Sequence, residues 1–323
     1  MIRVHKPGLA TTVQDQGRFG YYEIGMPPAG AMDHFASSVG NDLVGNPRTA
    51  AVLEATYIGP ELEFTESRLV ALTGADVPAK VNGESVPPWE ALLVRSGDVL
   101  SFDYLTSGAR IYIAVSGGID VPEYLGSRST YTLTGIGGFQ GRKLQEGDDL
   151  PLGADPGSGR SGVRLPDADV PTYPSVAELR IIVGLCSYRL AEESRKRFLE
   201  TEWRVTPDAD RVGYRYRGGT LEFVDREQPF GAGSNPANVV DLGYPLGSIQ
   251  VPGGVEPIVL LNDAVTGGGY ATIGTVISVD RDRLAQTKTG DRTRFVAVEL
   301  ADALQARREG KARLERIRQS LRC

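Results

Sequence analysis

The chain has 323 residues, of which 41% are hydrophobic and 24% charged, a composition typical of a globular protein with one large or two ordinary domains. A net charge of −6 and a pI of about 5.2 argue against nucleic-acid binding, which needs a basic face. Cys186 and Cys323 are too few and too far apart for a disulfide framework or a Cys-x-x-Cys metal site, which favours a reducing compartment. No apolar run approaches the roughly 18–20 residues of a membrane helix, and residues 1–20 contain no signal peptide, so we expect a cytoplasmic protein.

Residues 1–155 are expected to be mostly β-structure. Short runs rich in Val, Ile, Leu and Tyr alternate with turn signals such as Asn82-Gly83 and Ser107-Gly108, where Asn and Gly adopt positive φ at low cost. A strand spacing of about ten residues predicts a closed or nearly closed antiparallel barrel. The predicted strands cover residues 69–73, 91–95, 99–102 and 110–115.

One helix is predicted inside this β-rich part. Phe35, Val39 and Leu43 recur at steps of four within residues 34–44, Asp33 precedes them as a candidate N-cap, and a Gly-Asn-Pro sequence ends the run. A second, shorter helix is expected at residues 49–55.

The second half of the chain is expected to form a separate lobe. Residues 154–174 are rich in Gly, Ser, Pro and Asp without periodicity, which is typical of a linker. A strand at 178–183 and a helix at 191–201 follow, and residues 301–321 predict a charged, partly packed C-terminal helix. The fold prediction is therefore mainly β, with an N-terminal barrel lobe at 1–155, a linker at 156–174 and a C-terminal barrel lobe with the terminal helix at 175–323. Matching turn and strand sequences in the two halves hint at two related barrels.

Two glycine-rich blocks of the first lobe are candidates for ligand binding. In the GMPPAGAMD sequence at 25–33, Gly30 frees the backbone just before the helix whose unpaired N–H groups could hold a carboxylate or phosphate. Asp33 in the same block could instead be an ordinary helix cap. In the LGSRST sequence at 125–130, Arg128 could clamp an oxyanion, or it could be a surface arginine beside a hairpin.

Two blocks of the second lobe carry further candidates. Arg211 could face a substrate, or it could form a local ion pair worth about 0–1 kcal/mol at a surface. Gln250 and Asp263 each lie at the edge of an apolar run, so a buried amide and carboxylate there would need partners that a substrate could supply. Glycines 267–269, including Gly268, permit close approach of a ligand or of another backbone, and Tyr270 follows them. The alternative for this block is a buried turn network.

Several kinds of chemistry have no support in the sequence. The only histidines are His5 and His34, which exclude a His-based metal cluster or a Ser-His-Asp triad, so no metal site is expected. No GxxxxGK[ST] phosphate loop and no dinucleotide-binding fingerprint is present.

The ordered set of these blocks resembles the allophanate hydrolase subunit 2 family, also described as the biotin-dependent carboxyltransferase-like family, KipA, or the C subunit of bacterial 5-oxoprolinase. The resemblance covers about residues 3–300. It is carried by VQDQGR at 13–18, GMPPAGAMD at 25–33, GNP at 45–47, LTGA at 72–75, SGGID at 116–120, LGSRST at 125–130, RVTPDADRVGY at 204–214, SIQVP at 248–252, GGGYATIGTVI at 267–277, LAQ at 284–286 and RF at 294–295.

The resemblance implies two tandem cyclophilin-like β-barrel lobes and a partner protein similar to allophanate hydrolase subunit 1, or KipI. It implies a heteromeric hydrolase acting on amides, an ATP-dependent 5-oxoprolinase that opens 5-oxoproline to glutamate with a third subunit. One alternative is the carboxyltransferase component of a urea carboxylase or allophanate hydrolase system. The other is a non-catalytic, KipA-like antagonist that binds a kinase-inhibitor protein.

Cofactors and site roles follow from the same resemblance. The sequence contains no Ala-Met-Lys-Met motif, so biotin would be carried by a separate protein and ATP would act through the complex. Asp263 and Gln250 suit recognition of an amide, because a carboxylate accepts from N–H and a side-chain amide donates to C=O. Arg211 or Arg128 would neutralise a carboxylate or a phosphorylated intermediate. Asp33, Arg128, Tyr270, Gly268 and Gly30 complete the predicted substrate-binding set.

Four positions differ from the family pattern. Ala264 and Val265 stand where the family often has Arg-Gln, Ala271 follows Tyr270 where Pro is common, and Phe139 stands where His is common. Loss of the polar Arg-Gln pair would fit a different substrate or a chain kept for partner binding.

Overall fold

The computed structural model describes residues 1–322, which divide into two compact units. The first unit comprises residues 1–18, 29–173 and 311–322, and the second comprises residues 19–28 and 174–310. Neither unit is a continuous stretch of chain, because a short segment near the N-terminus belongs to the second and the end of the last helix to the first. The lobe and linker boundaries set from the sequence stay a prediction.

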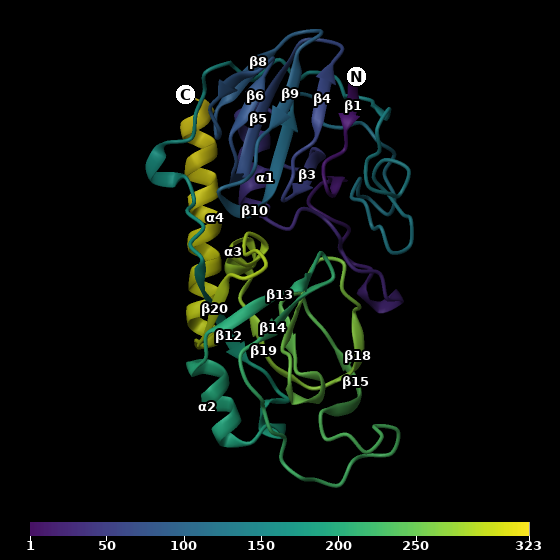
Figure 1. The fold of residues 1–323 in the computed structure, drawn as a ribbon, viewed down its shortest axis with the longest axis vertical. Coiled ribbons are helices and arrows are strands. Elements are labelled where there is room, and N and C mark those ends of the chain that lie inside the picture. The colour runs from purple at the N-terminus through teal and green to yellow at the C-terminus, as the bar shows by residue number, and fades with distance from the viewer. Residues whose placement is uncertain (323) are drawn as a thin grey trace. The chain divides into compact units, whose positions relative to one another are not determined.

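The first unit contains two antiparallel sheets (Figure 1). The six-stranded sheet has the order β11 (Asp149–Leu150), β1 (Ile2–Lys6), β4 (Glu61–Phe64), β9 (Val99–Phe102), β6 (Ala79–Val81) and β7 (Glu84–Val86). The five-stranded sheet has the order β2 (Thr11–Gln14), β3 (Val52–Thr56), β10 (Ser107–Val115), β5 (Arg68–Asp76) and β8 (Ala91–Val94).

One apolar core joins these two sheets. Alternation along β1 turns Ile2 and Val4 inward and Arg3 outward, as the period of two in a strand requires. These side chains belong to the same buried cluster as Leu53 of β3 and Ile111 of β10, from the other sheet. The strands of this unit therefore enclose a core between two sheets.

Helix α1 (His34–Leu43) packs on the other face of the five-stranded sheet. Phe35, Val39 and Leu43 belong to one buried cluster with Ala71 of β5, and Ile317 from the end of α4 (Leu300–Arg322) joins them. The helix predicted at residues 34–44 is confirmed and ends one residue earlier. The C-terminal helix predicted at residues 301–321 is also confirmed and extends one residue further at each end. The predicted helix at 49–55 is wrong, because residues 52–56 form β3, which pairs with both β2 and β10.

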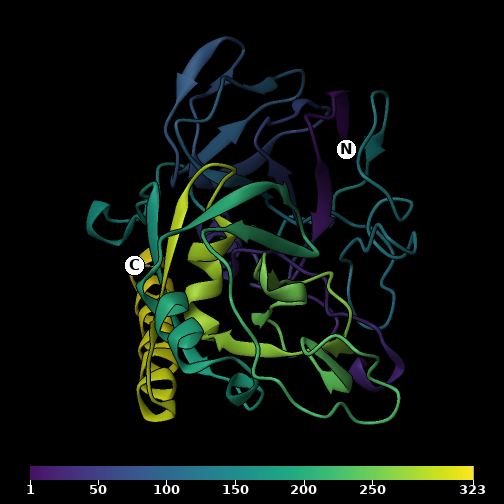
Figure 2. The ribbon, with the colours of Figure 1, turned by 60° about the horizontal axis from the view of Figure 1, so that its bottom comes forward.

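The second unit is a closed barrel. Its order is β12 (Val176–Val183), β19 (Thr272–Val276), β16 (Ser248–Gln250), β17 (Ile258–Leu260), β14 (Gly213–Arg217), β13 (Trp203–Ala209) and β20 (Arg292–Ala297). Figure 2 draws this part of the chain in colours from teal to yellow. The ring closes through a parallel pair, β12 with β20. A mainly β fold with a closed barrel and a C-terminal helix is thus confirmed.

Smaller elements surround the barrel. Helix α2 (Glu192–Glu200) anchors to it through Phe198, whose ring stacks on Phe295 of β20 at 4.8 Å. A two-stranded ribbon pairs β15 (Asn238–Gly243) with β18 (Gly267–Tyr270), and α3 (Arg281–Ala285) follows β19. Among residues 1–322, no helix is long and apolar enough to cross a membrane.

Candidate functional site

A buried ion pair holds together two loops at one end of the barrel. Arg211 lies in the turn before β14 and Asp263 follows β17, and these two strands are neighbours. Arg211 Nε and Nη2 donate to the two Asp263 carboxylate oxygens at 2.9 and 3.0 Å. The Asp263 N–H also donates to the Arg211 carbonyl at 3.0 Å. Only 2% of the Asp263 side chain and 14% of the Arg211 side chain are exposed.

This pair changes how Arg211 is interpreted. The sequence offered a substrate-facing cation or a local surface ion pair, with Asp210 as the neighbouring acid. In the structure Asp210 instead accepts from the Val212 and Gly213 N–H groups at 2.8 and 3.1 Å. The partner of Arg211 is Asp263, 52 residues further along the chain. The pair therefore fixes the loop of residues 261–266 against the turn before β14.

Three of the predicted residues, Gln250, Gly268 and Tyr270, lie around the side chain of Tyr244. Its hydroxyl accepts from the Tyr270 N–H at 2.7 Å and donates to the Tyr270 carbonyl at 2.9 Å. The Gln250 side chain hydrogen-bonds to the same hydroxyl. Burial raises the pKa of the Tyr244 phenol, and the Tyr270 and Gln250 hydrogen bonds oppose that rise. A Cβ on Gly268 would lie 3.0 Å from the Tyr244 ring, so glycine allows the ribbon to approach it.

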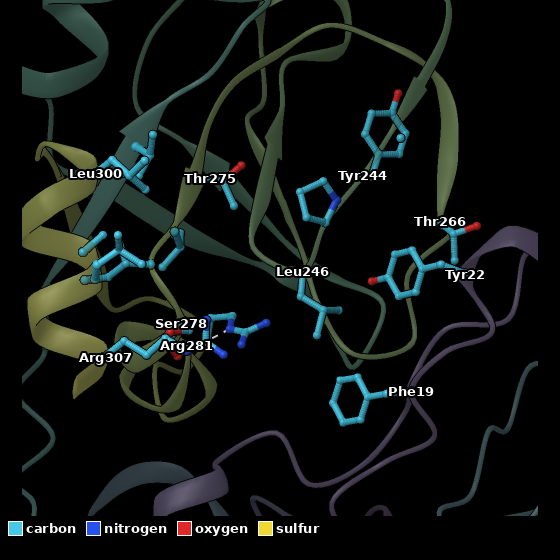
Figure 3. A pocket seen from close by; sticks show the side chains of 17 residues that line it. Phe19, Tyr22, Tyr244, Leu246, Thr266, Thr275, Ser278, Arg281, Leu300 and Arg307 are labelled. Carbon is cyan, nitrogen blue, oxygen red and sulfur yellow. Dashed lines mark hydrogen bonds between the residues drawn. The ribbon is translucent and has the colours of Figure 1, made fainter. Parts of the chain in front are cut away.

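A pocket of about 830 Å³ lies in the same unit (Figure 3). Tyr244 and Thr266 line it, and Ala264 packs against Tyr244, which connects the pocket to the loop that carries Asp263. The hydroxyl-bearing residues Thr266, Thr275 and Ser278 are among its lining residues, and hydroxyl groups both donate and accept. Its volume lies within the range of small-molecule sites.

The apolar wall of the pocket comes from several elements. Phe19 and Tyr22 come from the N-terminal segment of the unit, Leu246 follows β15, and Leu300 and Leu304 lie on α4. Burial raises the pKa of the Tyr22 phenol, and the nearby Arg281 cation opposes that rise. Arg281 of α3 and Arg307 of α4 supply cationic groups at the pocket.

The predicted residues of the first unit have local structural partners. Asp33 is the N-cap of α1, since its Oδ1 accepts from the Ala36 N–H at 2.8 Å. Gly30 has a φ of +85°, and a Cβ there would lie 2.9 Å from the Gly17 backbone. Glu54 also holds this loop, because its Oε2 accepts from the Met32 N–H at 2.8 Å and from the Tyr112 hydroxyl at 2.7 Å. Substrate binding by Gly30 and Asp33 stays a prediction.

Arg128 is neutralised by its own neighbourhood. Its Nε donates to the Val121 carbonyl at 2.9 Å, and its guanidinium pairs with Glu123 and lies 3.6 Å from Asp120. Its backbone N–H donates to Asp15 at 2.6 Å. These contacts match the surface-arginine alternative, and an oxyanion would have to compete with two carboxylates for this side chain.

The sequence did not single out Tyr244, Arg281 or Arg307. Tyr244 lies in a Gly-Tyr-Pro segment without periodicity, and the two arginines lie in charged stretches where most side chains are solvated. Three separate segments supply these residues, so only the fold could reveal that they share one pocket.

The chain matches a known protein family over most of its length. A family model described as "Carboxyltransferase domain, subdomain A and B" matches residues 24–297. The chain belongs to this carboxyltransferase family. The C subunit of the Escherichia coli (strain K12) 5-oxoprolinase is 35% identical over 318 residues, covering 98% of this chain and 97% of that protein.

The chain is also similar to segments of much longer proteins. The urea amidolyase of Saccharomyces cerevisiae is 33% identical over 303 residues, but the chain spans only 16% of its length. The crystal structure of the Kluyveromyces lactis urea amidolyase superposes with a TM-score of 0.92 at 32% identity, over 98% of this chain and 20% of that one. The chain thus corresponds to one domain segment of these urea enzymes.

Proposed function

We propose that this carboxyltransferase-family chain is one subunit of a heteromeric enzyme that opens an amide bond, with 5-oxoproline as the substrate. The observation that carries the proposal is the end-to-end match with the C subunit of a 5-oxoprolinase, which extends over 97% of that protein. The urea enzymes, by contrast, contain this segment within a much longer chain.

The pocket supports recognition of a small amide. A lactam presents one N–H and one C=O, and the hydroxyl groups of Thr266, Thr275 and Ser278 can satisfy both. The Arg211–Asp263 pair holds the loop that presents Thr266, and Gln250 holds the Tyr244 hydroxyl. We therefore assign Asp263, Arg211 and Gln250 as positioning residues in this proposal. Catalytic roles for the three stay predictions.

We assign ATP binding to other subunits of the proposed complex. The sequence has no phosphate-binding loop, so we propose that ATP is bound by a different subunit of the complex. The expected partners are a protein similar to allophanate hydrolase subunit 1, or KipI, and a third 5-oxoprolinase subunit.

The test is reconstitution of the complex. The chain should co-purify with the subunit 1 partner, and addition of the third subunit should give ATP-dependent release of glutamate from 5-oxoproline. A folded complex without glutamate release contradicts the proposal. Tight partner binding with no turnover would instead favour a KipA-like antagonist.

A carboxyltransferase role is the second candidate, and the TM-score of 0.92 with the Kluyveromyces lactis urea amidolyase favours it. Biotin would then arrive on a separate carrier protein, since this chain lacks the Ala-Met-Lys-Met motif. Transfer of the carboxyl group from a carboxybiotinylated carrier to urea, measured with the same complex, would support this candidate over the first.

A further inference from the structure

Two arginines at the pocket lack carboxylate partners. Arg281 and Arg307 both line it, and within the described residues 1–322 no ion pair within 4.0 Å involves either side chain. Arg281 Nε donates to the Ser278 carbonyl over a long 3.4 Å. Figure 3 shows the Arg281 guanidinium directed toward the hollow beside Leu246 and Phe19.

Some other arginines of this unit have carboxylate partners. Arg211 pairs with Asp263, and Arg180 forms two hydrogen bonds with Asp280, at 3.0 and 2.7 Å. A partly buried cation without a counter-ion is unfavourable, because burial removes its hydration. Burial accordingly lowers the pKa of Arg281; the nearby Asp282 and Tyr22 oppose this effect, and the positive charge of Arg307 adds to it. Two cations that repel each other beside a pocket form a site that an anion would stabilise.

The rest of the pocket defines the kind of anion. Its walls are formed largely by apolar side chains, including Phe19, Leu246 and Leu304, so the ligand should have a compact apolar or weakly polar body. A planar guanidinium matches the two oxygens of a carboxylate.

We propose that Arg281 and Arg307 bind the carboxylate of a small organic acid whose body occupies the apolar part of the pocket. This inference deepens the proposed function and rests on it for the identity of the acid, which is then 5-oxoproline. Urea has no carboxylate and gains nothing from these two cations. The arginines would therefore select a carboxylate-bearing amide over urea.

The test compares two ligands with the same lactam ring. Binding of 5-oxoproline and of 2-pyrrolidinone, which lacks the carboxylate, is measured by calorimetry on the full chain and on the reconstituted complex. Arg281→Gln and Arg307→Gln should each weaken 5-oxoproline binding about tenfold or more, as expected for loss of a charge-assisted contact. Binding of 2-pyrrolidinone should stay unchanged.

Arg308→Gln is the matched control, because Arg308 lies next to Arg307 on α4 and hydrogen-bonds only to Gln305 among the described residues. If both test variants bind 5-oxoproline as the wild type does, the inference is wrong. If Arg281→Gln fails to fold, Arg307→Gln decides alone, since its side chain is on an exposed stretch of helix.

The proposed function can fail separately from this inference. If the complex releases no glutamate, but benzoate binds the wild type and not the arginine variants, the carboxylate site stands and only its ligand is reassigned. If glutamate is released and the variants raise KM for 5-oxoproline with little change in kcat, both proposals stand. Unchanged KM in both variants overturns the carboxylate site and leaves the proposed function intact.

Discussion

At the scale of single residues, the Arg211–Asp263 pair differs from most ion pairs of the chain because water is excluded from it. Asp263 is 2% exposed, whereas Asp167, which pairs with Arg164, is 85% exposed. An exposed pair contributes little to stability, but removing one member of a buried pair leaves the other charge without compensation. Removing either Arg211 or Asp263 should therefore destabilise the fold as well as release the loop that carries Thr266.

Replacement of Asp263 tests this directly. Asp263→Ala should lower the free energy of unfolding by about 3–5 kcal/mol, because Arg211 would remain buried without a counter-charge. The control Asp167→Ala should change it by no more than about 0.5 kcal/mol. Urea unfolding measures both. The double variant Arg211→Gln, Asp263→Asn should recover part of the loss, and purely additive effects would contradict a coupled pair.

At the scale of elements, the loop before α1 depends on a glycine that must approach another backbone. Gly30 and Gly83 have nearly the same φ, +85° and +84°, but a Cβ on Gly30 would lie 2.9 Å from Gly17, while Gly83 has nothing within 4 Å. The two positions therefore share the backbone strain and differ in crowding.

This difference predicts unequal substitutions. Gly30→Ala should destabilise the chain by about 1–3 kcal/mol more than Gly83→Ala, since it adds overpacking to the cost of the left-handed conformation. Thermal or urea unfolding of both variants checks this. Equal losses would mean that the backbone around Gly17 moves aside without cost.

Acid sensitivity is predicted for the turn before β11. Arg142 donates to both Asp148 carboxylate oxygens at 2.8 Å and lowers the pKa of this acid, and the Gln145 N–H contributes further. A lowered folded-state pKa stabilises the fold above the unfolded value of about 3.9, and this contribution is lost as pH falls through the folded value. Wild type should thus exceed Asp148→Asn in stability at neutral pH, and the gap should close below about pH 4. A gap that is independent of pH would contradict this assignment.

Local sequence signals predicted those elements whose cause is local. The Asp33 cap and the spacing of Phe35, Val39 and Leu43 placed α1, and the strand at 99–102 was predicted at its observed bounds. The helix predicted at residues 49–55 does not form, because most of this segment belongs to β3, which is stabilised by pairing with strands far away in sequence. The predicted site shows the same limit. Gln250, Gly268 and Tyr270 were identified, but the ring that joins them, Tyr244, carries no local signal.

At the scale of the whole molecule, both units are built from separated parts of the chain. The second unit takes Phe19 and Tyr22 from a segment inserted near the N-terminus and uses them to line its pocket. The last helix contributes residues 300–310 to the second unit and the following residues to the first. Cutting the chain at residue 174 would therefore remove part of the pocket, and tests of function should use the full chain.

We propose that the chain serves a complex that opens a carboxylate-bearing amide. The most direct measurement offers 5-oxoproline and urea separately to the same reconstituted complex, with ATP, and follows glutamate release and urea carboxylation. We predict ATP-dependent glutamate release and no reaction of urea, with or without a biotinylated carrier. Carboxylation of urea without glutamate release would contradict the claim.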